Sequence, residues 1–342
     1  MSITAEQKLV VQFYESIGNK IPGHLVDIKD GPLVWNFIFE PDEKAKMPSL
    51  SSILKNQKDV IAVSGKNITF QIPKEKRKLI YLKDLMKTKD FINTKAVLPI
   101  ILGVDAVGKT KIEDLYKVPH LLVAAHTGSG KSVFIIGLIK SLISKLSPKE
   151  CKLLIFDPRM VDFARWNGEK HMLADVVTDV EDGLKMFERI TQMMDDRYQI
   201  LRQNNVRNVM EYREKTKKKD MPHIVIVMDE FCDYMQVAKK KMEKFVETIC
   251  TKARATGIHL ILGTQRPDAE TISKTIKAFI PSRISFQARN MTDSIQMLGE
   301  HGAERLLQMA DMLYSEAGCM PVQAIADADW HDCTLEDLEL PF

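Results

Sequence analysis

The sequence lacks the features that would place it in a membrane, in an oxidising compartment or among low-complexity chains. Within its 342 residues no apolar run reaches the roughly 18–20 residues that a membrane-spanning helix needs, and the N-terminus has no signal-peptide pattern. Its five cysteines are odd in number and form no CxxC spacing, which is typical of buried, reduced thiols. No internal repeat or biased segment is present. We therefore expect a globular cytoplasmic protein with no membrane segment.

The sequence also has no large excess of positive or negative charge. The net charge is +3, with 45% hydrophobic and 28% charged residues, which are ordinary values for a folded protein and argue against wholesale disorder. So small a net charge does not indicate a particular class of binding partner, and it is compatible with a local basic surface for nucleic acid. The length suffices for one large domain and a smaller one.

The N-terminal part has the pattern of a small α+β unit. Residues 1–20 predict a short amphipathic helix, and the bounded apolar run of residues 31–41 predicts a strand. "SLSSILKNQ" predicts a short helix, and "VIAVSGKNITFQIP" predicts two strands around a Ser64-Gly65 turn. This unit ends near Leu85.

A lysine-containing stretch without a clear period, residues 86–99, is expected to connect this unit to the rest of the chain. We divide the sequence accordingly into an N-terminal helix, a small α+β subdomain and a large domain, with the bounds 1–20, 21–90 and 91–342.

The large domain alternates short apolar runs with helical stretches. The runs are "HLLVAA", "KLLIFD", "HIVIVMDE", "HLILGTQ" and "RISFQA". Strands buried on both faces of a parallel sheet have this composition, so the sequence predicts a doubly wound α/β fold. Ligands of such sheets bind at the carboxyl ends of the strands, where the polar residues of these runs lie.

A charged insert, "REKTKKKDMP" at residues 213–222, interrupts this alternation. We interpret it as a solvated surface loop, with contact to a polyanion as the alternative.

A phosphate-binding loop follows the first of these runs. "AHTGSGKS" at residues 125–132 matches seven of the eight positions of G-x-x-x-x-G-K-[ST] between a strand and a helix. Gly128 and Gly130 would let main-chain N–H groups converge on the phosphates, Lys131 would reach the β- and γ-phosphates, and Ser132 would hold Mg²⁺. The exception is Ala125, where a reshaped entrance is expected. The predicted ATP-binding residues of this segment are Thr127, Gly128, Ser129, Gly130, Lys131, Ser132 and Val133.

Two acidic residues end the run "HIVIVMDEF". Asp229 suits the second shell of the Mg²⁺ ion, and Glu230 is placed to activate the attacking water as a general base. Thr264 and Gln265 end another strand and would sense the γ-phosphate beside the loop.

An arginine from a neighbouring subunit often completes such sites. Arg254, after a helix and just before a strand, and Arg283, at the start of another strand, are the two candidates. Each has an ordinary alternative as a salt-bridged surface residue.

Together these segments resemble the motor domain of the FtsK/SpoIIIE family of DNA translocases. The resemblance rests on "VPHLLVAAHTGSGKSV", "LLIFDPRMVDF", "IVMDEFCDYM", "KARATGIHLILGTQRPDAETISKTIKAFIPSRISF" and "GAERLLQMADMLY", and it covers roughly residues 20–326 in the family's order. The segment before residue 91 resembles the small α subdomain of these motors. Ala125 stands where the family has glycine, and Arg159 stands where it usually has lysine.

This resemblance implies a RecA-like ATPase that assembles as a homo-hexameric ring and moves double-stranded DNA through its pore. By matching position it implies that Asp157 is an acid near the active site, and that Arg254 is the first choice for the trans-acting arginine. It also places DNA-contacting loops near Arg289 and Arg305. Two other functions stay open, a related secretion-type ATPase that moves protein and a nucleotide-dependent assembly switch.

Overall fold

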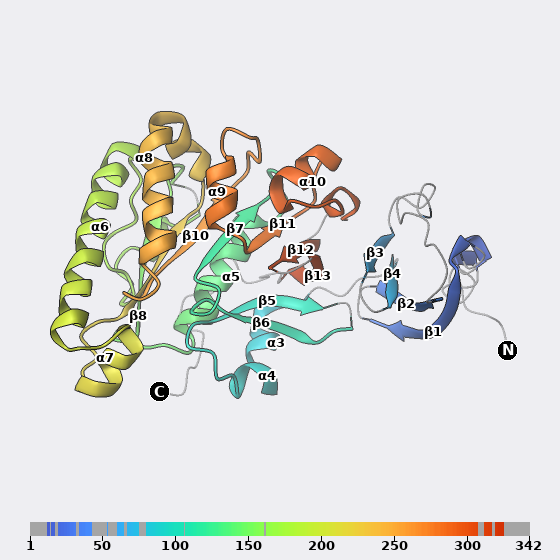
Figure 1. Cartoon of the computed structure of the whole chain (residues 1–342), viewed down its shortest axis with the longest axis horizontal. Helices are drawn as coiled ribbons and strands as arrows, with labels where there is room; N and C mark the ends of the chain where they lie inside the picture. The colour runs from blue at the N-terminus through green and yellow to red at the C-terminus, as the bar shows by residue number, and fades with distance from the viewer. Residues whose placement is uncertain are drawn as a thin grey trace.

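The strands of this protein form two separate sheets. The computed structural model describes residues 12–13, 15–17, 20–31, 34–42, 53, 60–64, 67–74, 80–105, 107–160, 162–306, 311–316 and 319–324. Within them, one sheet has four strands and the other has nine. Figure 1 shows the small sheet at one end of the molecule, while the large sheet and its helices make up the rest.

The small sheet is antiparallel throughout, in the order β1-β2-β4-β3. Its strands are β1 (Gly23–Asp30), β2 (Val34–Pro41), β3 (Ile61–Ser64) and β4 (Ile68–Pro73). The strand predicted within residues 31–41 and the two strands beside Ser64 are confirmed. The strand β1 was not predicted, because its residues Val26 and Ile28 are exposed at the sheet edge and give no alternating pattern.

Aromatic side chains form the core of the small sheet. The rings of Phe39 and Phe70 meet edge to face at 5.6 Å, and Phe13 from the N-terminal segment packs 5.2 Å from Phe37. Residues 12–13 and 15–17 are helical, as predicted. The helix predicted for "SLSSILKNQ" and the Gly65 position lie outside the described residues, apart from Ile53.

Five parallel strands form one side of the large sheet, in the order β11-β7-β10-β9-β8, with β8 at the edge. They are β7 (His120–Ala124), β8 (Cys151–Phe156), β9 (His223–Met228), β10 (Ile258–Thr264) and β11 (Arg283–Ser285). Every residue of β7, β9 and β10 is buried. The five predicted strands and the α/β fold class are confirmed.

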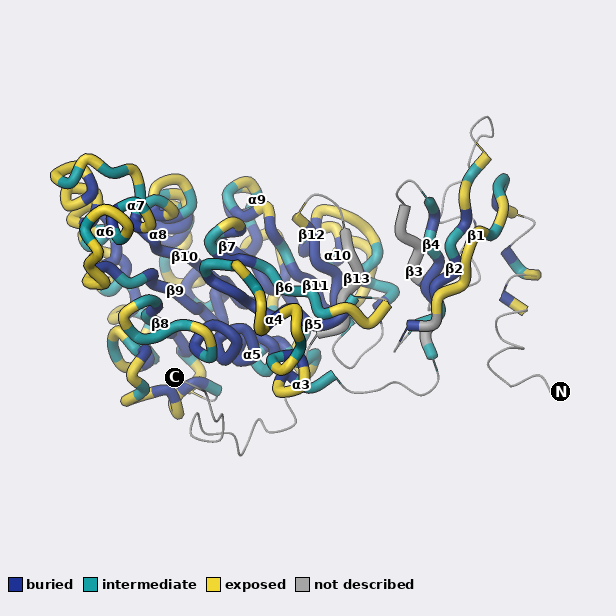
Figure 2. The backbone as a smooth tube through the Cα atoms, turned by 90° about the horizontal axis from the view of Figure 1, so that it is seen from below, coloured by how far each residue is buried: buried dark blue, intermediate teal, exposed yellow. Residues whose placement is uncertain are grey.

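Helices cover both faces of this sheet, which is why its strands are continuously apolar (Figures 1 and 2). Alternate residues of one strand point to different cores: Leu121 and Val123 pack with α5, whereas Leu122 packs with the helices of the other face. On that face the rings of Phe187 and Phe245 stack at 4.3 Å. The main helices are α5 (Lys131–Ile143), α6 (Val180–Gln203), α7 (Val209–Thr216), α8 (Phe231–Lys252), α9 (Lys274–Phe279) and α10 (Met291–Leu298), with short turns η2 (Ala164–Trp166) and η3 (Ala303–Arg305).

Four antiparallel strands extend the large sheet beyond β11, and the sequence did not predict them. They are β12 (Asp311–Ser315), β13 (Cys319–Ala324), β5 (Pro99–Asp105) and β6 (Thr110–Asp114). The predicted connector 86–99 was partly wrong as well. Two short helices, α3 (Leu82–Met86) and α4 (Lys89–Ile92), precede β5, and α4 is held by its Thr88 cap and the buried Phe91. Helices of four or five residues are too short to show a period.

The charged insert is only partly the predicted loop. Helix α7 continues to Thr216, capped at its start by Asn208, and Lys217 ends it in a left-handed conformation with φ 59°. The Arg213 guanidinium is half-buried and donates to the Met221 and Glu150 carbonyls. Residues 217–220 are exposed, so the surface-loop prediction applies only to them.

Candidate active site

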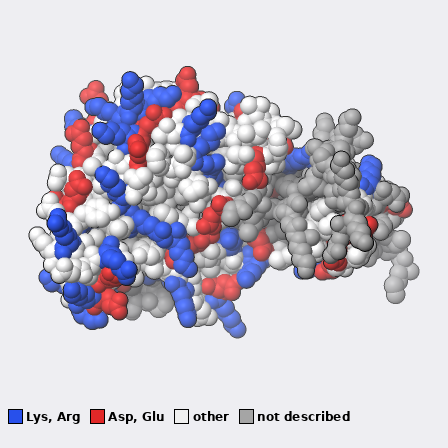
Figure 3. Space-filling model, in the orientation of Figure 1, with Lys and Arg blue, Asp and Glu red and all other residues white. Residues whose placement is uncertain are grey.

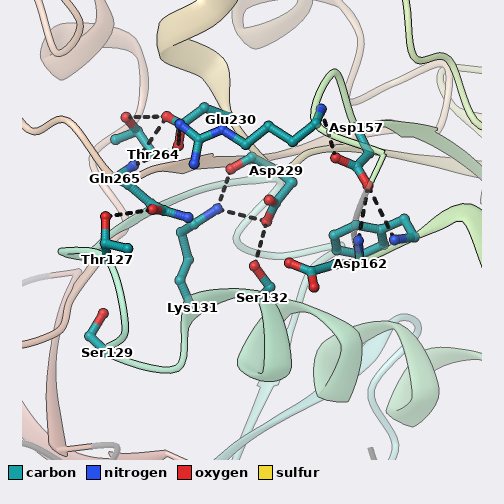
Figure 4. Close-up of polar contacts among 12 residues, drawn as sticks. Thr127, Ser129, Lys131, Ser132, Asp157, Asp162, Asp229, Glu230, Thr264 and Gln265 are labelled. Atoms are coloured by element: carbon teal, nitrogen blue, oxygen red, sulfur yellow. Dashed lines mark hydrogen bonds and ion pairs between the residues drawn. The ribbon is translucent and has the colours of Figure 1, made fainter. Parts of the chain in front are cut away.

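Residues from four strand ends meet at the carboxyl edge of the large sheet. The loop 125–132 follows β7, Asp157 follows β8, Asp229 and Glu230 follow β9, and Gln265 follows β10. Figure 4 shows their side chains pointing into one region in front of helix α5. The parallel topology brings these distant segments together, because the carboxyl ends of parallel strands share one edge.

The loop 125–132 has the backbone that a phosphate cradle requires. Gly128 and Gly130 have φ values of 82° and 93°, which favour glycine, and a Cβ at either would meet nothing within 4 Å. Glycine is therefore needed here for its conformation. Ser129 folds the loop back, since its main-chain N–H and its hydroxyl both donate to the His126 carbonyl. The chain then enters α5 at Lys131, whose first-turn N–H groups have no partner within the helix.

Ala125 takes part in the core. Its side chain is fully buried in the cluster that includes Phe134 and Phe286, and its N–H donates to the Thr264 carbonyl at 3.1 Å. Its φ is not positive, so this position has no need of glycine. The methyl group is part of the core cluster that packs around α5.

Lys131 and Ser132 both contact Asp229. The Lys131 ammonium is buried and lies 2.6 Å from Asp229 Oδ1, and it also donates to the Asp229 main-chain carbonyl. The Ser132 hydroxyl donates to the same Oδ1 at 3.3 Å. Burial raises the pKa of the Asp229 carboxyl, and the neighbouring Lys131 opposes that shift. The predicted Mg²⁺ residues, Ser132 and Asp229, thus lie side by side.

Glu230 is fully buried and held from two sides. One carboxylate oxygen accepts from the Thr264 hydroxyl at 3.0 Å, and both accept from the Gln265 N–H at 3.1 and 3.2 Å. An Arg159 nitrogen lies 3.1 Å from Oε2. Burial raises the pKa of Glu230, while Lys131, the Gln265 N–H and Arg159 lower it.

The predicted sensor is connected directly to the phosphate loop. The Thr127 hydroxyl donates to the Gln265 side-chain oxygen at 2.8 Å (Figure 4). Because the Gln265 main chain also donates to Glu230, one residue contacts both the loop and the predicted general base.

Asp157 organises a loop. Its buried carboxylate accepts the main-chain N–H groups of Arg159, Asp162 and Phe163, each at 3.2 Å. Both of its oxygens are used in this way. The turn they form presents Arg159 to Glu230, a contact that the sequence reasoning missed. The only signal in the sequence was the arginine in "DPR", two residues after the acid that ends a predicted strand.

The two candidate trans-acting arginines lie at the opposite edge of the sheet, at the amino ends of β10 and β11. Arg254 is exposed, with its guanidinium carbon 6.0 Å from the centre of the Tyr116 ring. Arg283 is half-buried and donates to the carbonyls of Lys277, Ile280 and Leu298. Neither is brought to the site of its own chain, and Arg283 would have to exchange three bonds to act elsewhere.

The predicted DNA-contacting arginines occupy different settings. Arg289 is exposed between β11 and α10. It lies near His126 of the phosphate loop: burial is the largest cause that lowers the pKa of His126, and the charge of Arg289 is the second. His126 Nε2 also lies 3.3 Å from Asp293 Oδ2 at the start of α10. Arg305 is half-buried, 3.8 Å from Glu304, and donates to the Val60 carbonyl at 3.5 Å.

Comparison with known proteins identifies the family. The sequence profile of the FtsK/SpoIIIE family matches residues 81–269, more than half of the chain. The chain belongs to the FtsK/SpoIIIE family. A DNA translocase FtsK from Mesorhizobium japonicum is 37% identical over 339 residues, which covers 87% of this chain and 38% of the relative. The DNA translocase FtsK of Caldanaerobacter subterraneus subsp. tengcongensis is 38% identical over 308 residues, with coverages of 87% and 43%. This FtsK/SpoIIIE chain thus spans about two fifths of the length of these relatives.

Solved structures agree on the fold. The pCW3 conjugation coupling protein TcpA, in its monomer form with ATPγS, is similar with a TM-score of 0.65 at 22% identity, covering 93% of this chain and 94% of that one. The cytoplasmic domain of the type VII secretion ATPase EccC of Thermomonospora curvata has a TM-score of 0.63 at 22% identity, covering 72% and 32%. The P-loop ATPase fold expected for this family is therefore confirmed. Among the helices of the described residues, none combines the length and apolarity that a membrane crossing requires.

Proposed function

We propose that this chain is the ATP-hydrolysing motor of a double-stranded DNA translocase. The observation that carries the proposal is the bonded group of Lys131, Asp229, Glu230 and Gln265, which joins three strand ends of an FtsK/SpoIIIE fold. The related proteins named DNA translocase FtsK support DNA as the substrate that is moved.

ATP binding would draw on the loop and on Lys131. Phosphate oxygens carry more negative charge than a main-chain carbonyl, so we expect Lys131 to exchange its bond to the Asp229 carbonyl for one to the β- and γ-phosphates. Main-chain N–H groups at residues 128–132 would supply the remaining donors at the positive end of α5.

The oxygens of Ser132 and Asp229 suit a magnesium ion. Both are hard donors, they lie 3.3 Å apart, and Asp229 is buried beside the loop. When bound, Mg²⁺ would neutralise charge on the β- and γ-phosphate oxygens.

Glu230 would act as the general base. A water molecule attacks the γ-phosphorus, the bond to the β-phosphate oxygen breaks, and the water proton passes to Glu230, leaving ADP and phosphate. The Thr127–Gln265 contact would report the state of the γ-phosphate to β10 and to Glu230, because Gln265 contacts both.

We further propose a homo-hexameric ring with DNA in its pore, in which Arg254 reaches the neighbouring nucleotide and Arg289 and Arg305 contact DNA. The exposure of Arg254 and Arg289 supports these roles. Basic and acidic side chains are interspersed on the face shown in Figure 3, so this face does not form one continuous basic surface. Residues 21–90 would form the small subdomain and residues 91–342 the motor. The free Cys151, Cys232 and Cys250 support a reducing, cytoplasmic location.

The test is the ATPase rate with and without duplex DNA, over a range of salt concentrations. We expect strong stimulation that falls steeply with salt, because phosphate contacts release counterions. Arg289→Ala and Arg305→Ala should reduce the stimulation and leave the basal rate unchanged if the two arginines act only on DNA. A rate that ignores DNA would overturn the proposal, and stimulation by a protein substrate would favour a secretion-type ATPase.

A further inference from the structure

Arg159 is the one cation outside the phosphate loop that contacts Glu230 within the described residues. The charged groups facing Glu230 are Lys131 from α5 and Arg159 from the loop after β8, with Asp229 adjacent in the chain. Lys131 is engaged by Asp229 and is expected to turn to the phosphates. Arg159 is therefore the cation that can stay with Glu230 throughout hydrolysis.

The loop that carries Arg159 is built to present it. The Asp157 carboxylate holds the main chain of this loop at three residues, because it accepts the N–H groups of Arg159, Asp162 and Phe163. Met160 adopts φ 55°, a conformation uncommon for a residue with a side chain. The buried Asp157 carboxylate therefore anchors the main chain at Arg159 itself and again at Asp162 and Phe163.

A second carboxylate holds the far side of the guanidinium. Arg159 Nε lies 3.8 Å from Asp233 Oδ2 in the first turn of α8, while Nη2 lies 3.1 Å from Glu230 Oε2. A planar guanidinium can contact two carboxylates at once, whereas a lysine ammonium on one flexible stem is a single point of charge. This explains what an arginine can do at a position where related motors usually have lysine.

The Arg159 contact also adds a charged partner to Glu230 Oε2, which otherwise has fewer bonds than Oε1. Thr264 and Gln265 approach Glu230 from β10, and both of their bonds reach Oε1, with one further bond from the Gln265 N–H to Oε2. Oε2 is thus held by the Gln265 N–H and by the Arg159 guanidinium. A buried base must hold its lone pair toward the attacking water, and a displacement of about 1 Å can lower a rate about 100-fold.

We propose that Arg159 is a positioning residue that orients the Glu230 carboxylate for hydrolysis, and that Asp233 in turn orients Arg159. This inference rests on the proposed ATPase function. Arg159 would act through Glu230, without contacting the nucleotide.

The experiment measures single-turnover hydrolysis and affinity for labelled ATP in Arg159→Ala, Arg159→Lys and Asp233→Asn, each with and without Glu230→Gln. We expect Arg159→Ala to lower the hydrolysis rate about 10- to 100-fold with unchanged ATP affinity. Arg159→Lys should recover part of the rate, and Asp233→Asn should lose less than Arg159→Ala. In the Glu230→Gln background, Arg159→Ala should cause no further loss. The matched control is Arg189→Ala, an exposed arginine on α6, which should keep the full rate.

Three outcomes would overturn the inference. Weakened ATP affinity in Arg159→Ala would place the arginine on the phosphates. An equal loss in the Glu230→Gln background would show that it acts independently of Glu230. A full hydrolysis rate in Arg159→Ala would show that Glu230 needs no such partner. If Arg159→Ala does not fold, full rates in both Arg159→Lys and Asp233→Asn would show the same. A wild-type protein without ATPase activity would instead refute the proposed function itself.

Discussion

The two edges of the parallel sheet differ in how their polar side chains are paired. At the carboxyl edge, Lys131, Asp229 and Glu230 are buried and bonded to one another or to β10. At the amino edge, His120 is buried and neither of its ring nitrogens has a hydrogen-bond partner in the described structure, while the buried His259 contacts His223 through its Nε2. The polar groups of the first edge can exchange partners with a ligand, whereas the histidines of the second are enclosed in the core.

The amino edge is a cluster of neutral histidines. His223 Nδ1 lies 3.2 Å from His259 Nε2, and the Tyr116 ring meets His223 edge to face at 5.7 Å. Burial, with Arg254 as a second cause, lowers the pKa of His120 to about 4, and burial with Arg213 and Arg197 lowers that of His223 to about 3. We therefore expect the histidines of the amino edge to contribute to how stability responds to pH.

The largest expected effect is at the carboxyl edge. Lys131→Ala should abolish ATP binding and reduce hydrolysis to background, since the one side-chain cation reaching the β- and γ-phosphates is lost. Binding of labelled ATP measures this. Unchanged affinity would refute the phosphate-loop interpretation.

Arg254→Ala tests whether the amino edge is purely structural. If this arginine serves a neighbour's nucleotide, hydrolysis should fall by roughly 10³–10⁵ while ATP binding persists. Mixing it with Lys131→Ala protein should restore some turnover, because an intact loop can then meet an intact arginine. Mixed rings, verified by mass, that are no more active than either parent would argue against Arg254 and favour Arg283.

Glu230→Gln should separate binding from chemistry. We expect the hydrolysis rate to fall about 10²- to 10⁴-fold, the range for loss of a general base, with ATP binding retained. The protein should accumulate with ATP bound, as measured by filter binding and by product formation in the same sample. Near-normal turnover would remove Glu230 from this role.

Acidification should destabilise the protein through the amino edge. The pKa values of His120 and His223 are lowered in the folded state, so the stability of the folded state that depends on their neutral form is fully present above about pH 6.5. This stabilising contribution is lost as the pH falls toward 4 for His120 and 3 for His223, because the unfolded chain binds the protons first. The free energy of unfolding should fall by up to about 1.4 kcal/mol per pH unit for each histidine.

Urea unfolding at pH 7.5, 6.5 and 5.5 measures this slope. His120→Leu should make the slope shallower, whereas replacing the exposed His301 with leucine is the matched control. An equal slope in His120→Leu and wild type would show that the cluster does not cause the acid sensitivity.

The smallest effect is expected at the entrance of the phosphate loop. Ala125→Gly should leave turnover nearly unchanged, since the amides at residues 128–132 carry most of the phosphate contact. It should lower the free energy of unfolding by about 1 kcal/mol, because a buried methyl group is lost and the chain gains freedom when unfolded. A large rise in rate or affinity would show instead that Ala125 restricts the site.

Local signals in the sequence predicted the central strands and the phosphate loop. Runs such as "HLILGTQ" are buried on both faces and need no knowledge of their neighbours to be recognised. The positions of Gly128 and Gly130 follow from φ values that residues with side chains avoid. The pair Asp229 and Glu230 was predicted because both follow a strand directly. These features depend on residues adjacent in the chain.

Strand order and cross-strand contacts were decided only by the tertiary structure. The strand β5 pairs with β13, more than 200 residues away, and no local pattern specifies that register. Asp157 was expected near the active site from its position in the sequence, but only the fold shows that its carboxylate accepts three N–H groups of the following turn. Arg159 and Glu230 are 71 positions apart and meet because β8 lies beside β9 in the sheet. The sequence determined which segments form strands and which residues can carry the chemistry. The packing of those strands decided which of the residues meet, because a hydrogen bond or an ion pair depends on distance in space and not on distance along the chain.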